Sequence, residues 1–275
     1  MKYMLLRIFG HGLTLIFGDT LVLDRWRWLK RYLPRTAGQE LLIDVGCGSG
    51  AFTLGAAKLG YRALGLSWDE RNNAEAKLRA KVLHLDHNAS FDVLDVRRLD
   101  QLETNRGEYS FVVNCENIEH IVDDSKLIKD AYDLLVPGGR LLLTTPNYYF
   151  KALDRGDDGP YEPIEDGRHV RRGYSRIELI ELLEFHGFLV ETVEYCSGYF
   201  SQKITSLLRA LSRVSGPIAW VIALPLRVLP GVFDRPRATG NPPGFSICVV
   251  ALKPRFSDLK IQSGADRATK ATSRV

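Results

Sequence analysis

The sequence predicts an α/β fold in which a parallel sheet is covered by helices on both faces. Short, nearly continuous apolar runs alternate with segments of helical pattern from residue 40 onward, and strands that are apolar throughout are typical of a buried parallel sheet. A glycine-rich turn follows the first of these runs directly. The chain has 275 residues, 45% of them hydrophobic, which is enough to fill one sizeable core.

The predicted elements follow one another in a regular order. Each helix has a recognisable stop, such as Gly60 or the Pro-Gly-Gly turn that follows the third helix. The predicted strands are 41–45, 61–66, 89–94, 109–114, 140–145, 188–196 and 245–252. The predicted helices are 51–60, 69–83, 123–135 and 174–188.

Two further segments interrupt this order. Residues 146–173 are rich in Gly, Asp and Pro, and their length indicates a lid rather than a passive connection. Residues 197–243 form an insertion before the last strand, which we expect to be helical because Ile204 and Leu207 begin an apolar helical face. The last residues, 257–275, are polar and basic, and we expect them to be disordered.

Charge is distributed unevenly along the chain. Residues 1–36 contain seven Lys and Arg and two acidic residues, and residues 197–243 contain six Lys and Arg and one acidic residue. The net charge of the whole chain is only +4. The intervening core is therefore acidic. Apolar, basic appendages on an acidic globule favour an anionic membrane surface as a partner over a nucleic acid.

Targeting signals are weak. The apolar N-terminal run is interrupted by Arg7, His11 and Asp19 and lacks a small-residue cleavage site, so it is a poor signal peptide. The uncharged stretch 214–226 is too short to span a bilayer. The four cysteines include no C-x-x-C pair, which favours a reducing compartment. We expect a cytoplasmic protein that is peripheral on the inner face of the membrane if it contacts one.

The glycine turn DVGCGSG is the most specific feature of the sequence. Its glycines remove side chains where a strand turns into a helix, so that a ligand can approach backbone N–H groups. Gly46, Gly48 and Ala51 also fit the dinucleotide fingerprint G-x-G-x-x-A. However, Asp44 would repel a pyrophosphate, and Ser67 stands where a nicotinamide enzyme places its ribose carboxylate. Both observations favour a cationic cofactor.

Together with LLVPGGRLLLTTPN, this turn resembles the class I S-adenosylmethionine-dependent methyltransferases, over about residues 38–195 and the final strand. The resemblance implies a Rossmann-like sheet of seven strands with the last antiparallel, extra N-terminal helices and an insertion before the last strand. It further implies a helical arm over 1–37 and an S-adenosylmethionine-binding methyltransferase domain over 38–256, with the tail following.

The same resemblance implies which residues bind the cofactor. The glycine turn cradles its methionine part, Asp95 at the end of the third strand accepts a hydrogen bond from the adenine amino group, and residues after the fourth strand line the methyl-donor cavity. Ser67 replaces the acid that the family usually carries, and Asp69 either supplies that carboxylate or caps the next helix. The expected cofactor-binding residues are Asp44, Gly46, Cys47, Gly48, Gly50, Ser67, Asp95, Val96 and Glu116.

The stretch CENIEH follows the fourth strand and places Glu116, Glu119 and His120 at the edge where parallel strands form a crevice. If a helical turn starts near Glu116, the three side chains share one face. His120 then acts as a general base beside Glu119, or the cluster binds a divalent ion together with a lid histidine such as His169, or the pair only ends a turn. We favour His120 and Glu119 as catalytic residues.

The E-x-x-E-H arrangement also resembles the metal sites of small-RNA 2′-O-methyltransferases and of ubiquinone-pathway O-methyltransferases, so the metal question stays open, with a divalent metal not favoured. Around His169, the basic side chains of Arg168, Arg171 and Arg172 either hold an anionic group of the acceptor or pair with the acids of the lid.

The sequence thus predicts an S-adenosylmethionine-dependent methyltransferase that acts on a hydroxyl of a small or amphipathic acceptor, such as a lipid, a quinol or a sugar. The insertion and the N-terminal arm would cover the acceptor site. Two other classes remain: an NAD(P)-dependent oxidoreductase that uses the same glycine loop, and a non-catalytic, cofactor-binding membrane adaptor.

Overall fold

The computed structural model describes residues 2–16, 18–102, 106–153, 158–234 and 244–255. The tail predicted to be disordered, 257–275, and the last part of the insertion, 235–243, lie outside these residues.

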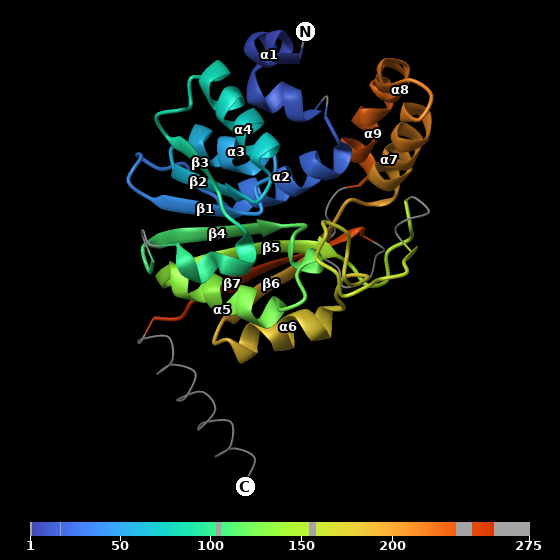
Figure 1. Ribbon diagram of the computed structural model, residues 1–275. Helices are drawn as coiled ribbons and strands as arrows, with labels where there is room; N and C mark the ends of the chain where they lie inside the picture. The colour runs from blue at the N-terminus through green and yellow to red at the C-terminus, as the bar shows by residue number, and fades with distance from the viewer. Residues whose placement is uncertain (1, 17, 103–105, 154–157, 235–243, 256–275) are drawn as a thin grey trace, which may run out of the picture.

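The seven predicted strands form one sheet in the order β3-β2-β1-β4-β5-β7-β6 (Figure 1). Strands β1 to β5 pair in parallel, whereas β7 is antiparallel to both of its neighbours. The predicted seven-stranded sheet with an antiparallel last strand is therefore confirmed. The strands are β1 (Leu41–Val45), β2 (Arg62–Ser67), β3 (Ala89–Val93), β4 (Tyr109–Cys115), β5 (Leu135–Pro146), β6 (Leu189–Cys196) and β7 (Ser246–Leu252).

Helices cover both faces of the sheet, as predicted. In Figure 1, the helices α2 to α4 lie on one face and α5 and α6 on the other. The α-helices are α1 (Lys2–Ile16), α2 (Thr20–Tyr32), α3 (Ala51–Lys58), α4 (Glu70–Val82), α5 (Asp124–Leu134), α6 (Arg176–Phe185), α7 (Tyr199–Ser212), α8 (Gly216–Ala223) and α9 (Val228–Phe233). Short 3-10 helices are η1 (Val96–Gln101), η2 (Ile118–His120) and η4 (Pro225–Arg227).

Strand β5 is longer than predicted. It begins at Leu135, so the Pro-Gly-Gly segment lies inside the strand rather than between a helix and a strand. The register with β4 shifts there: Tyr109 pairs with Leu135, whereas Phe111, two residues later, pairs with Arg140. An irregularity of this kind accommodates the extra residues without breaking the sheet.

The N-terminal arm is part of the core. Trp28 and Leu29 of α2 are buried, and they belong to the apolar cluster that packs on the sheet. The insertion rests on the same helix, since the hydroxyls of Thr20 and Thr205 lie 2.8 Å apart and Ser201 donates a hydrogen bond to Asp24. Helix α2 therefore connects the insertion to the sheet.

Among the residues described, no single helix is long and apolar enough to cross a membrane. The pair Leu6–Ile16 and Thr20–Tyr32 meets the criteria of length and composition only when taken together, and it is bent by 87°.

Candidate active site

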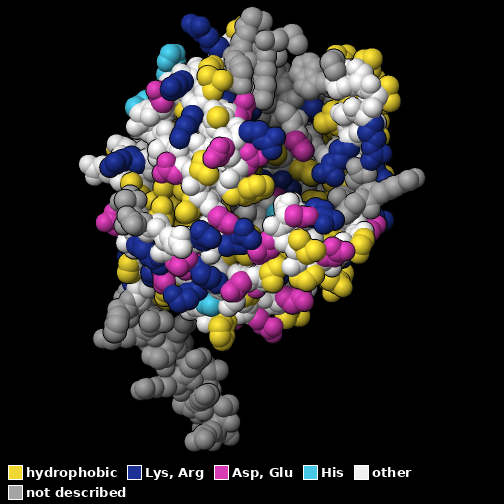
Figure 2. Space-filling view, in the orientation of Figure 1, with side chains coloured by type: hydrophobic (Ala, Val, Ile, Leu, Met, Phe, Trp, Pro, Cys, Tyr) yellow, Lys and Arg dark blue, Asp and Glu magenta, His cyan; other side chains and the backbone are white. Residues whose placement is uncertain are grey.

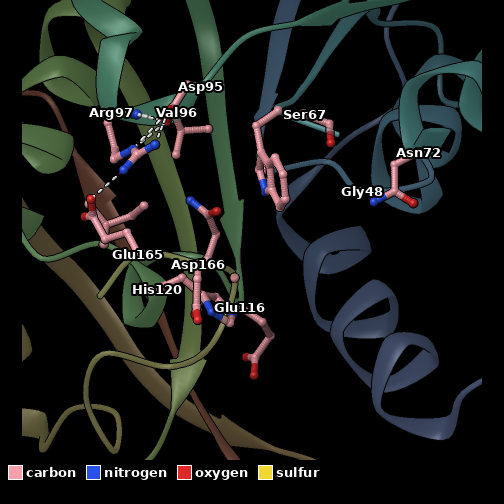
Figure 3. Close-up of a pocket in the computed structure, with 15 residues that line it drawn as sticks. Gly48, Ser67, Asn72, Asp95, Val96, Arg97, Glu116, His120, Glu165 and Asp166 are labelled. Atoms are coloured by element: carbon pink, nitrogen blue, oxygen red, sulfur yellow. Dashed lines mark hydrogen bonds and ion pairs between the residues drawn. The ribbon is translucent and has the colours of Figure 1, made fainter. Parts of the chain in front are cut away.

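A cavity of about 460 Å³ opens at the carboxyl ends of β1 to β4. The strand order reverses between β1 and β4, and ligands of open α/β sheets bind at such a switch point. Figure 3 shows Asp95 and Arg97 on one side of this cavity, Ser67 and Asn72 on the other, and Glu116 and His120 at a third. The cavity is lined by Gly46, Gly48, Ser67, Trp68, Asn72, Asp95, Val96, Arg97, Glu116, Asn117, His120, Ile121, Glu165, Asp166 and Gly167.

The glycine turn supplies one wall through its backbone. Gly48 has a φ of +51°, and a Cβ placed on it would meet no atom within 4 Å, so a ligand can approach the main chain there. Gly50 caps α3 and lies against Phe91 instead. Of the turn residues expected to bind the cofactor, Gly46 and Gly48 line the cavity, whereas Cys47 and Gly50 lie behind it and shape the turn.

Asp44 faces the start of α3 and not the cavity. Its side chain is buried, and one oxygen, Oδ2, accepts hydrogen bonds from the Thr53 N–H (3.0 Å) and the Thr53 hydroxyl (2.7 Å). Burial raises the pKa of Asp44 to about 6, although the bonds from Thr53 act in the opposite direction. This carboxyl therefore fixes the turn on the helix, and its expected role beside a cationic ligand stays a prediction.

Asp95 lies on the cavity wall as predicted. It caps η1 by accepting a hydrogen bond from the Arg97 N–H, and the Arg97 guanidinium also donates to its carboxylate. These bonds lower the pKa of Asp95, so it carries a charge at neutral pH. The other end of Arg97 pairs with Glu165 of the lid at 2.7 Å. Glu165 in turn accepts a hydrogen bond from the Val122 N–H. This chain of contacts holds the lid against the cavity.

The opposite wall comes from the end of β2. Ser67 lines the cavity, and its hydroxyl accepts a hydrogen bond from the Asp69 N–H at 3.3 Å. Asp69 caps α4 by accepting from the Arg71 N–H, so of the two interpretations of Asp69 the helix cap is confirmed. Asn72, in the first turn of α4, is a cavity residue that the motif did not predict.

Glu116 is held at the cavity edge in an uncommon conformation. Its φ is +49°, in the left-handed region that non-glycine residues rarely adopt. The carboxylate pairs with Arg25 of α2 at 2.9 Å and accepts a hydrogen bond from Thr144 at 3.1 Å. The expected helical turn starting near Glu116 does not form, because this backbone breaks the path into η2. Glu116 therefore does not share one helical face with Glu119 and His120.

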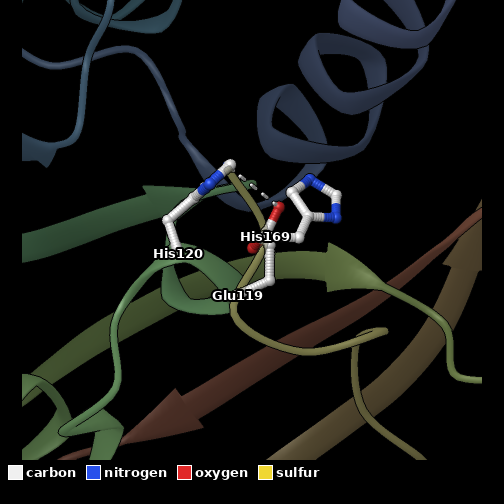
Figure 4. Close-up of side chains that lie close together, drawn as sticks. All are labelled: Glu119, His120 and His169. Carbon is white, nitrogen blue, oxygen red and sulfur yellow. Dashed lines mark ion pairs between the residues drawn. The ribbon is translucent and has the colours of Figure 1, made fainter. Parts of the chain in front are cut away.

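Glu119, His120 and the lid residue His169 come together behind the cavity (Figure 4). One ligand atom from each lies within 4.8 Å of the others. Glu119 is fully buried, and its Oε2 accepts a hydrogen bond from Thr145 at 3.1 Å, whereas Oε1 lies 3.9 Å from the His120 Nε2. Burial raises the pKa of Glu119 well above its usual range, and the neighbouring Glu116 raises it further.

This cluster suits two kinds of chemistry. A buried carboxyl beside an imidazole can share a proton with it, which assists a general base. A carboxylate with two imidazoles also suits a divalent cation such as Mn²⁺ or Zn²⁺. Glu119 Oε1 and His120 Nδ1 find no hydrogen-bond partner within the described ranges. Of the three members of the cluster, His120 is the one that lines the cavity.

The arginines of the lid are paired with acids. Arg168 bonds Asp166 and Arg172 pairs with Asp158 at 3.0 Å, whereas Arg171 pairs with Asp124 of α5. The interpretation that these arginines pair with the acids of the lid is therefore confirmed for Arg168 and Arg172, and Arg171 joins the lid to α5 instead.

Several cavity residues lie outside the motifs that sequence reasoning used. Trp68, Arg97 and Asn117 directly follow residues that were singled out, so their position in the sequence could have identified them. Glu165 and Asp166 reach the cavity through the path of the lid, which no local pattern reveals.

The comparisons with known proteins agree with this geometry. Residues 22–193 match the methyltransferase domain family. A protein of Mycolicibacterium smegmatis named "probable S-adenosylmethionine-dependent methyltransferase" is 32% identical over 162 residues, which cover 59% of this chain and 56% of that protein. The ubiquinone biosynthesis O-methyltransferase of Psychrobacter arcticus is 28% identical over 164 residues, which cover 53% of this chain and 63% of the relative. The match thus spans less than two thirds of either relative.

Solved structures share the fold at low identity. Phosphoethanolamine N-methyltransferase 2 of Haemonchus contortus aligns with a TM-score of 0.59 at 20% identity, covering 87% of this chain and 55% of that one. Geranyl diphosphate C-methyltransferase of Streptomyces coelicolor aligns with a TM-score of 0.54 at 18% identity, covering 82% of this chain and 74% of that one. Because the family match covers more than half of the chain and the sheet has the predicted order, the chain belongs to the methyltransferase domain family and has the fold of the class I S-adenosylmethionine-dependent methyltransferases.

Proposed function

We propose that this protein transfers a methyl group from S-adenosylmethionine to a hydroxyl oxygen of a small or amphipathic acceptor. The observation that carries the proposal is one cavity in which the open main chain of Gly48, the charged Asp95 and the imidazole of His120 all lie on the wall. Such a cavity offers a binding wall for a nucleoside at one end and a proton acceptor at the other.

The residues present fit this cofactor. The bare backbone at Gly48 leaves room for a bound molecule, and Asp95 and Ser67 offer hydrogen-bond acceptors on opposite walls. Asp95, Val96 and Ser67 would hold the nucleoside, and Gly46, Gly48 and Glu116 the amino acid part. When bound, the cofactor supplies a methyl group on a positively charged sulfur, which is already a good leaving group. The protein then has to orient the acceptor and accept its proton.

His120 is the residue placed to accept that proton. As the acceptor oxygen forms its new bond to carbon, its O–H bond breaks and the proton moves to the imidazole. Glu119 lies directly behind, and the negative charge of its ionised carboxylate can stabilise the protonated ring. Arg25 balances the charge of Glu116, so the cavity edge does not carry two uncompensated carboxylates.

An amphipathic acceptor is supported by the names of two relatives. The two ubiquinone-pathway relatives of Psychrobacter arcticus and Shewanella pealeana, each 28% identical, are named as O-methyltransferases. A polyprenyl quinol, a hydroxylated lipid or a lipid-linked sugar all fit this proposal.

A labelling experiment tests the proposal. The protein is incubated with methyl-labelled S-adenosylmethionine and a total lipid extract, and label is counted in the organic phase after alkaline washing. We expect transfer that falls at least a hundredfold in His120→Ala, since a positioned general base contributes on the order of 10²–10⁴. The matched control is His87→Ala, an exposed histidine that does not line the cavity. Label that stays in the aqueous phase would contradict an amphipathic acceptor, and equal rates for both variants would contradict His120 as the base.

A further inference from the structure

We propose that the protein docks on an anionic lipid surface through the apolar end formed by α1, α8 and α9. We call this surface the apolar end and define it by its exposed side chains. They are Ile8, Phe9, Leu13, Ile16, Val214, Ile218, Val221, Ile222, Val228, Val232 and Phe233.

The first support is the exposure of the insertion helices. The six side chains that α8 and α9 contribute to the apolar end are between 44% and 67% exposed. Single exposed aliphatic side chains are ordinary, but a contiguous group marks an interaction surface. Figure 2 shows hydrophobic side chains gathered over α7 to α9, with basic side chains beside them.

The second support is continuity between two segments far apart in the sequence. The guanidinium of Arg227 in η4 donates a hydrogen bond to the carbonyl of Ile16 at the end of α1, at 3.4 Å. This contact brings the C-terminal end of α1 next to η4, which lies between α8 and α9, at the same end of the molecule in Figure 1. The exposed side chains of the two segments therefore lie at one end of the molecule.

The third support is charge. Residues 199–233 contain four Lys or Arg and no acidic residue, and residues 2–16 contain two Lys or Arg and no acidic residue. Of these bases, Arg227 is buried beside Asp19, whereas Lys203, Arg209 and Arg213 lie along α7 and after it. The first acid after α9, Asp234, accepts hydrogen bonds from the N–H groups of Phe200 and Ser201 and so serves as the cap of α7. An apolar face with a mainly basic margin complements a surface that offers acyl chains beneath negative headgroups.

The same charge argues against a second copy of this chain as the occupant. Two apolar ends brought together would bring their basic margins together, whereas an anionic bilayer attracts them. The docking is independent of the proposed methyl transfer, so each can fail alone. The insertion rests on α2, and Arg25 of the same helix reaches the cavity edge, so α2 joins the apolar end to the site.

Vesicle cosedimentation tests the inference with the full chain. One set of vesicles is pure phosphatidylcholine, and the other contains about 30% phosphatidylglycerol, which gives the negative surface potential that basic residues sense. We expect binding to the anionic vesicles, weakened by salt because the Debye length falls from about 10 Å at 0.1 M to about 3 Å at 1 M.

A matched pair of double variants locates the surface. Val221→Glu/Val228→Glu changes side chains of the apolar end that are 62% and 67% exposed, and we expect at least a tenfold loss of vesicle affinity. Ile177→Glu/Phe185→Glu changes equally exposed apolar residues of α6, on the other side of the sheet, and should bind vesicles as the unmodified protein does. Circular dichroism and S-adenosylhomocysteine binding confirm that both variants are folded.

Three outcomes would overturn the inference. The first is no binding to anionic vesicles at any salt concentration. The second is an equal loss of vesicle affinity in both double variants, which would mean that the added negative charge alone repels the membrane. The third is a dimer seen by ultracentrifugation without lipid and abolished by Val221→Glu/Val228→Glu, which would assign the apolar end to a second copy.

Discussion

The guanidinium of Arg25 lies 2.9 Å from the carboxylate of Glu116, and both side chains are largely buried. Arg25 comes from α2 in the N-terminal arm, and Glu116 follows β4 at the edge of the cavity. Arg25 also donates to the hydroxyl of Ser246 at the start of β7. One arginine thus joins the arm, the last strand and the cavity.

Breaking this pair should destabilise the protein strongly. Arg25→Met leaves the Glu116 carboxylate buried without its cation, and we expect a loss of about 3 kcal/mol in the free energy of unfolding. Arg25→Met/Glu116→Gln removes both charges and should recover most of that loss. Urea unfolding of the two single variants and the double variant measures the coupling.

A surface pair provides the control for this cycle. Arg140 and Glu191 form an ion pair with side chains 40% and 31% exposed, and their coupling should stay below about 1 kcal/mol. If the coupling of Arg25 with Glu116 is no larger than that of the surface pair, the arm is not tied to the site electrostatically.

Asp95 should govern affinity for the cofactor. Asp95→Asn keeps the shape of the side chain but removes the charge that Arg97 stabilises, and we expect S-adenosylhomocysteine to bind about tenfold or more weakly. The control is Asp100→Asn in the same 3-10 helix, whose carboxylate pairs with Lys126 and does not line the cavity. Calorimetric titration compares the two. Equal affinity in both variants would remove Asp95 from the binding wall.

Asp44 should make stability depend on pH. Burial raises its pKa from 3.8 to about 6, so the folded state favours the protonated form and loses stability as the pH rises from about 4 to above 6. Both hydrogen bonds from Thr53 reach one oxygen, so Asp44→Asn can keep them without the charge. We expect the variant to match the unmodified protein below pH 4 and to exceed it at pH 8, by up to about 3 kcal/mol.

The measurement is urea unfolding of both proteins between pH 4 and pH 8. The difference between their free energies of unfolding should grow through this window and level off above it. A difference that is constant with pH would show that Asp44 is ionised in the fold at all of these values.

A chelator separates the two chemistries of the Glu119, His120 and His169 cluster. If His120 is the base and no ion takes part, transfer is unaffected by EDTA, falls at least a hundredfold in His120→Ala, and falls much less in His169→Ala. If an ion acidifies the acceptor hydroxyl, EDTA abolishes transfer, and His120→Ala and His169→Ala lose metal binding alike. Loss of activity with EDTA and its return with added Mn²⁺ would therefore contradict the general-base account.

Regular elements of this fold follow from local patterns. The seven strands could be predicted because buried parallel strands are apolar throughout, and the reversal of order at β1 and β4 follows once the glycine turn identifies the family. The boundary of β5 could not be predicted, because the Pro-Gly-Gly segment joins the sheet only through its pairing with β4. Pairing between distant segments cannot be recognised from the sequence of either segment alone.

The site could be predicted in part for the same reason. Gly46, Gly48, Ser67, Asp95, Val96, Glu116 and His120 line the cavity as expected, because each lies at the end of a strand that a pattern identifies or within a few residues after it. Arg25 and Glu165 reach the site from the arm and the lid, whose paths are set by tertiary contacts. The side chain of Asp44 turned away from the cavity because the free N–H and hydroxyl of Thr53 compete for it.

Calorimetric titration of the purified chain with S-adenosylhomocysteine and, separately, with NADH tests the central claim most directly. The cavity at the glycine turn predicts one S-adenosylhomocysteine bound per chain, with no heat from NADH. Binding of NADH at that site, or no binding of S-adenosylhomocysteine, would contradict the account of this protein as a methyltransferase.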